Sequence, residues 1–120
     1  PALAKTLEEE MPQVLDYLES QLPQQGFLFG SVSIADISIA AFFRNAAFAR
    51  FRIDAGRWPL TAAFVERVLG LEAFGRLKPF EDRLMRTPIP QHRAALAELG
   101  APLSAESYAT AAPRRGIMRI

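Results

Sequence analysis

The segment from Val32 to Ile37 constrains this chain more than any other, because it fixes the start of an unusually apolar helix. The Ser33 hydroxyl is placed to accept a hydrogen bond from the Asp36 backbone N–H. The Asp36 carboxylate is placed to accept a hydrogen bond from the Ser33 backbone N–H in return. Val32 and Ile37 have the spacing of a hydrophobic staple across this capping box. The pattern predicts a helix start at Ser33, with a cap that contributes on the order of 1 kcal/mol.

The helix that follows is predicted to run from residue 33 to about residue 50 and to be apolar around most of its circumference. Its few polar residues are Asp36, Ser38, Arg44, Asn45 and Arg50. A helix with so little polar surface is typical of the interior of a bundle, where other helices surround it. We therefore expect a buried central helix.

The rest of the chain shows helical rather than alternating periodicity. An apolar stripe predicts one bent helix over about residues 3–22, with Pro12 at the bend. Four further helices are expected over residues 59–70, 72–77, 79–85 and 91–99. No strand pattern or internal repeat is present, so the predicted fold class is all-α.

The 120 residues are enough for a single domain, which we expect to have its core over about residues 2–87 and a C-terminal helix and tail over 88–120. The longest uncharged apolar stretch of the central helix, Ile37–Phe43, is far shorter than the ~20 residues of a membrane span. The first residues also lack the order of a signal peptide. We expect no membrane association.

Charge and cysteine usage narrow the class of protein further. The net charge is +1, from 14 basic and 13 acidic residues, and no broad basic face is visible, so nucleic-acid binding is not expected. The arginines Arg114, Arg115 and Arg119 are best explained as a solvated terminus. The absence of cysteine excludes disulfides and thiolate metal sites and agrees with a reducing cytoplasm.

The residues most often used in catalysis form no recognisable constellation. His92 is the one histidine, and no partner lies at metal-ligand spacing from it, so we expect an ordinary surface position. The acidic run from Glu8 to Glu10 is typical of a helix first turn. No serine has the glycine pattern of a nucleophile elbow. The sequence therefore predicts no catalytic residue and no metal site.

The capping box and its surroundings resemble the C-terminal helical domain of the cytosolic glutathione transferases. The run L-x-x-x-x-F-L-x-G-x-x-S-I-A-D extends from Leu22 to Asp36, and the segments Leu15–Glu19 and Phe74–Leu77 fit the same pattern. The resemblance covers about residues 2–87. It implies a helical bundle around a central buried helix, which the box begins.

The resemblance also suggests substrate-cleft candidates on the central helix, namely Phe42, Arg44, Asn45 and Phe48. Polar groups on a mostly buried helix must find partners or line a cleft. In the family, the helix face near the position of Asn45 can border the active-site cleft, and some members have an aromatic residue there. This chain departs from them with asparagine. For Phe42 and Phe48, core packing is the favoured interpretation and a pocket the alternative.

In this family, glutathione and the residue that activates it lie on an N-terminal thioredoxin-like domain. No β-α-β pattern is present here, so we expect the chain to be a fragment of a longer protein. The resemblance implies a cytoplasmic parent protein, a homodimer when full length, with glutathione as co-substrate. The fragment alone is expected to bind no cofactor and to be inactive.

Two functions remain open at this point. The parent protein can be an enzyme that adds glutathione thiolate to an electrophile, with the helical domain as the apolar wall for the co-substrate. Alternatively, the domain can be a non-catalytic protein–protein interaction module, as in translation factors and synthetases.

Overall fold

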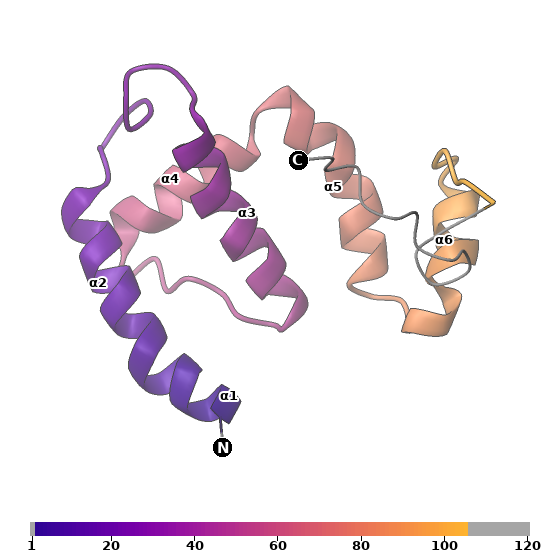
Figure 1. The fold of residues 1–120 in the computed structure, drawn as a ribbon, viewed down its shortest axis with the longest axis horizontal. Helices are drawn as coiled ribbons and strands as arrows, with labels where there is room; N and C mark the ends of the chain where they lie inside the picture. Colours follow the sequence, from indigo (N-terminus) through magenta and orange to yellow (C-terminus); the bar gives the residue numbers. More distant parts are fainter. Residues whose placement is uncertain (1, 106–120) are drawn as a thin grey trace, which may run out of the picture. The chain divides into compact units, whose positions relative to one another are not determined.

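The computed structural model describes residues 2–105, in which the regular secondary structure is helical (Figure 1). The helices are α1 (Ala2–Lys5), the π-helix η1 (Thr6–Glu10), α2 (Met11–Gln21), α3 (Ile34–Phe48), α4 (Pro59–Leu69), α5 (Glu72–Leu84), the 3₁₀-helix η2 (Ile89–Gln91) and α6 (His92–Glu98). Among the described residues, β pairing is limited to one isolated bridge between Phe29 and Ser31. The predicted all-α class is confirmed. The arginines Arg114, Arg115 and Arg119 lie outside the described residues.

The chain divides into two compact units, Pro1–Lys78 and Pro79–Ile120. The first, called unit 1 below, holds the helices from α1 to α4 and the start of α5. The second, unit 2, holds the end of α5, η2 and α6. The division predicted from the sequence, with a core over residues 2–87, stays a prediction.

The first helical run of unit 1 is continuous from α1 to α2 and contains an irregular turn just before Pro12. Because proline has no N–H and its ring collides with the carbonyl four residues earlier, the chain cannot keep regular α-helical bonding there. The chain forms the wider π-turn η1 instead, in which the Met11 N–H donates to the Thr6 carbonyl. The bent helix predicted over residues 3–22 thus takes the form of one run with a π-turn.

The core of unit 1 is built around α4. Two clusters of buried apolar side chains contain Met11, Leu15, Phe43, Trp58 and Val65 in the first, and Leu22, Ala40, Phe64 and Val68 in the second. Helix α4 contributes to both clusters and packs against both α2 and α3 (Figure 1). Helix α4 therefore lies against two helices of unit 1, while Ala63 and Glu66 on its remaining face are exposed.

Helix α3 buries one face within unit 1, so the central buried helix predicted from the sequence is not confirmed. The buried residues of α3 are Asp36, Ala40 and Phe43. Ile34, Ile37, Phe42 and Phe48 on the same helix are exposed. Helix α3 packs on α4, and within the described residues of unit 1 its opposite face has no comparable cover. Apolar composition alone did not reveal which face would lack a neighbour.

A second correction concerns Pro79, which the sequence analysis placed at the start of a new helix. The structure has one helix, α5, with Pro79 in its interior. The proline removes the hydrogen bond that would reach the Gly75 carbonyl, yet the turns on either side keep theirs. The helix therefore continues through a residue that more often ends one.

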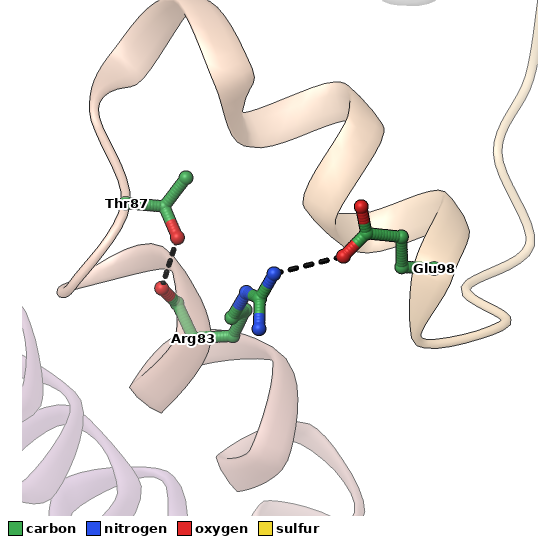
Figure 2. A network of polar contacts seen from close by, with 3 residues as sticks. All are labelled: Arg83, Thr87 and Glu98. Atoms are coloured by element: carbon green, nitrogen blue, oxygen red, sulfur yellow. Dashed lines mark hydrogen bonds and ion pairs between the residues drawn. The ribbon is translucent and has the colours of Figure 1, made fainter.

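Several polar contacts join the segments of unit 2. The Arg83 guanidinium donates to the Glu98 carboxylate at 2.8 Å, and the Thr87 hydroxyl donates to the Arg83 carbonyl at 2.7 Å (Figure 2). The His92 ring, which is partly buried, donates from Nε2 to the Thr87 carbonyl at 2.8 Å. Exposed ion pairs of this kind contribute little, typically below ~1 kcal/mol. His92 fixes a turn rather than facing a reaction centre.

Candidate functional site

The start of α3 is organised by one fully buried carboxylate, that of Asp36. Its Oδ2 atom accepts hydrogen bonds from the Ser33 N–H at 2.8 Å and from the Ser33 hydroxyl at 2.6 Å. The Ser33 Oγ atom in turn accepts the Asp36 backbone N–H, which completes the capping box. The chain has the box at the position where the sequence predicted it.

The same carboxylate makes a third contact that the sequence analysis did not predict. Its Oδ1 atom accepts the Leu28 N–H at 2.9 Å, across eight residues. This bond ties the loop before α3 to the first turn of the helix, so the cap also fixes the path of the loop. Val32 and Ile37 both remain partly exposed, and the staple between them stays a prediction.

The electrostatics of Asp36 fit a structural role. Burial acts to raise the pKa of its carboxyl, but the hydrogen bonds from Ser33, Leu28 and its own N–H outweigh this effect and hold the pKa below the ordinary value. The group is therefore ionised at neutral pH, fully buried, and committed to these donors. A carboxylate in that state has no proton to give and no access to a substrate.

The start of α4 is capped by a carboxylate that belongs to a different helix. Glu19 of α2 accepts the Leu60 N–H, the Thr61 N–H and the Thr61 hydroxyl, each at 2.8 Å. Burial acts to raise the pKa of Glu19, and these three bonds together lower it below the ordinary value. A carboxylate at a helix N-terminus also interacts favourably with the helix dipole. Glu19 therefore fixes α2 against the start of α4.

A second bond joins the same two helices one turn away. The indole Nε1–H of Trp58 donates to the Asp16 carboxylate at 2.7 Å, and Arg57 lies 3.5 Å from the other carboxylate oxygen. The Arg57 guanidinium also sits over the Trp58 ring, 4.3 Å from its centroid. These contacts orient α4 and through it α3, because α3 packs on α4.

The four substrate-cleft candidates lie on the C-terminal half of α3. The side chains of Phe42 and Phe48 are 51% and 44% exposed, so the interpretation of both as core residues is wrong. The Phe42 ring meets the buried ring of Phe43 edge to face, with 5.2 Å between centroids. Asn45, three residues from each phenylalanine, is exposed, and Arg44 is partly buried. This segment presents two aromatic surfaces with an amide between them.

The exposed rings of Phe42 and Phe48 give this surface an apolar character. Within residues 2–105, no group of three or more His, Cys, Asp or Glu side chains is arranged to hold a metal ion. The two carboxylates with lowered pKa values, Asp36 and Glu19, are committed to backbone donors. Aromatic side chains with few polar groups are typical of sites for apolar small molecules.

The fold and the surface together define an all-helical domain with a capped, half-exposed helix. The family model "Glutathione S-transferase, C-terminal domain" matches residues 1–67, which is more than half of the chain. The chain belongs to this family, as the sequence pattern predicted. Comparisons with curated proteins and with solved structures gave no match. None of the helices in the described part of the chain has the length and apolar character needed to span a membrane.

Proposed function

We propose that this chain is the C-terminal domain of a cytoplasmic glutathione transferase-like protein and that α3 supplies the apolar wall for the co-substrate. In the parent protein, an N-terminal thioredoxin-like domain would bind glutathione and lower the pKa of its thiol. The thiolate sulfur would then bond to an electrophilic carbon, and the leaving group would depart with the electron pair. The parent would be a homodimer, and this chain would bind no cofactor itself.

The half-exposed rings of Phe42 and Phe48 carry this proposal. Packing within unit 1 leaves about half of each ring uncovered, and an apolar ligand is the kind of molecule that gains most from covering them. Asn45 between them has an amide that can donate to a carbonyl, nitro or similar group on the ligand. The surface thus favours a flat, apolar electrophile with one polar substituent.

The proposal is tested by steady-state kinetics of the full-length parent protein. Phe48→Ser and Phe42→Ser should each lower kcat/KM for an apolar aryl electrophile by roughly tenfold, because each removes apolar contact worth about 1–2 kcal/mol. The KM for glutathione should stay unchanged, since glutathione binds to the other domain. Tyr17→Ser, on the exposed side of α2, is the matched control. Equal kinetics in all four proteins would contradict the proposal.

The second candidate is a non-catalytic interaction module. The observation that favours it is the exposure of apolar side chains at the beginning of α3, away from the four candidates of the wall. Retention of the full-length protein on glutathione-agarose, with release by free glutathione, would support the enzyme. A full-length protein that folds but passes through the column unretained would support the module.

A further inference from the structure

Helix α5 contains two residues that weaken a helix, four positions apart, and neither the caps nor the proposed wall involves them. Gly75 and Pro79 both lie inside this helix. Glycine favours a helix less than any residue except proline, because its backbone loses the most freedom on folding. Proline has no N–H to donate to the Gly75 carbonyl, and its ring crowds the preceding turn. The turn from Gly75 to Pro79 is therefore the weakest part of α5.

This turn also lacks the packing that usually stabilises a helix. We call its five residues, from Gly75 to Pro79, the α5 joint, and all five are exposed. A Cβ atom added to Gly75 would meet no atom of another described segment within 4 Å. Most helical stability in proteins comes from tertiary packing. The joint therefore depends on the hydrogen bonds of its own turn, and one of these bonds is missing.

The two ends of α5, in contrast, are anchored. Before the joint, Phe74 packs against the second buried cluster of unit 1. After the joint, the Arg83 guanidinium donates to the Glu98 carboxylate of α6 (Figure 2). The boundary between unit 1 and unit 2 falls inside the joint, between Lys78 and Pro79. A bend in the joint therefore leaves the contacts at both ends of the helix intact.

We propose that the α5 joint is a hinge, at which the helix bends and straightens while its two ends keep their contacts. Three features coincide in this one turn, namely a missing hydrogen bond, a glycine and the absence of burial. Pro79 sets the position of the bend, because the Gly75 carbonyl that it leaves free can turn toward water and open the helix on that side. This inference depends on α5 alone and does not rest on the proposed function.

The hinge is tested by the distribution of distances between two spin labels on either side of the joint. The chain has no cysteine, so Ala73→Cys and Arg86→Cys, both at exposed positions, provide the two labelling sites. The distribution should be broad in this labelled chain. Pro79→Ala should narrow it by roughly half, because the alanine N–H can donate to the Gly75 carbonyl. Gly75→Ala should narrow it less, and its Cβ has room.

Amide hydrogen exchange gives a second measurement, which needs no label. The amides of Arg76 and Leu77 should exchange faster than those in the middle of the packed helix α4. Pro79→Ala should slow the exchange of both amides about tenfold, because it removes the weakest point of the helix.

Pro12→Ala is the matched control, with the same substitution in the first helical run of unit 1, and it should change neither the width of the distribution nor the exchange in α5. A narrow distribution in the labelled chain that still has Pro79 would overturn the proposal. Equal widths and equal exchange rates with proline and with alanine at position 79 would do the same, because α5 would then be a rigid helix despite its proline.

Discussion

The starts of α3 and α4 are each stabilised by a carboxylate that accepts backbone N–H groups. At α3 this carboxylate is close to its donors in the sequence, and at α4 it is far from them. At α3, the carboxylate of Asp36 captures the N–H of Ser33, three residues away. At α4, the carboxylate of Glu19 captures the N–H groups of Leu60 and Thr61, 41 and 42 residues away. Both are ionised carboxylates that satisfy donors which a helix leaves without partners in its first turn.

The difference shows that a cap can act within a helix or between helices. The Asp36 cap defines where α3 begins and how its loop approaches. The Glu19 cap does not need to define the start of α4, since Pro59 already favours a first helical position. Its effect is to fix the distance and angle between α2 and α4, on which the core of unit 1 depends.

The largest effect should come from Asp36→Ala. The change leaves the N–H groups of Ser33 and Leu28 without their partner in a partly buried place, and each such group costs about 1–3 kcal/mol when water cannot replace the acceptor. We expect a loss of about 4 kcal/mol in the free energy of unfolding, measured by urea denaturation. Asp54→Ala, which removes one bond in an exposed turn, should cost less than ~1 kcal/mol. Similar losses for the two variants would contradict the role given to Asp36.

Glu19→Ala should have the next largest effect, about 2–3 kcal/mol, because the Leu60 and Thr61 donors then lose their acceptor. A double-mutant cycle with Thr61→Val should give a coupling energy of about 1 kcal/mol, since the hydroxyl bonds to the same carboxylate. Glu66→Ala, at an exposed position of α4, is the control. The Glu19 and Asp36 losses should add, because the two sites share no partner. Strong non-additivity would show that the caps are not independent.

Ser33→Ala should cost about 1 kcal/mol, the ordinary value for a capping serine. The loss is smaller than for Asp36→Ala because the Leu28 and Ser33 N–H groups keep their carboxylate. Amide hydrogen exchange should show faster exchange in the first turn of α3 and no change in α4. If Ser33→Ala destabilised the chain as much as Asp36→Ala, the serine and not the acid would be the centre of the cap.

Acid should weaken both caps together. The pKa values of Asp36 and Glu19 are lowered in the folded state. The two carboxylates therefore make their full contribution to the free energy of unfolding above the pKa of the unfolded chain, which is about 4. This contribution is lost as the pH falls through the lower pKa values of the folded state. The urea concentration at the midpoint of unfolding should decrease as the pH is lowered from about 6 to about 2. Asp36→Asn and Glu19→Gln should each flatten this fall. An unchanged slope in both variants would show that other carboxyl groups control acid unfolding.

The local features of the fold could be predicted from the sequence, and those that depend on tertiary contacts could not. The capping box of Ser33 and Asp36 and the start of α4 at Pro59 follow from neighbours in the chain. The exposure of Ile34 depends on which helices pack around α3, which its composition does not specify. Pro79 was misplaced because a proline raises the cost of a helix without forbidding it.

The candidate site on α3 stays a prediction, but the exposure of its side chains can be compared with what the sequence indicated. Phe42, Arg44, Asn45 and Phe48 were suggested by the family resemblance. A core role was the favoured interpretation for the two phenylalanines, and their exposure does not support it. Asp16 and Glu19 lie in a segment that fits the family pattern, but their contacts with α4 were not predicted, because an acid on a helix surface looks the same in the sequence whether or not it meets another helix. A hydrogen-bond acceptor for Trp58, the one tryptophan, could have been predicted, because a buried indole N–H needs a partner.

The most direct test of the functional account is the rate of glutathione conjugation by this chain alone, with an apolar aryl electrophile. The account predicts the uncatalysed background rate, because the chain contributes a binding surface and no group that activates the thiol. A rate close to that of the full-length parent protein would contradict it, since a reacting group would then have to lie within these 120 residues.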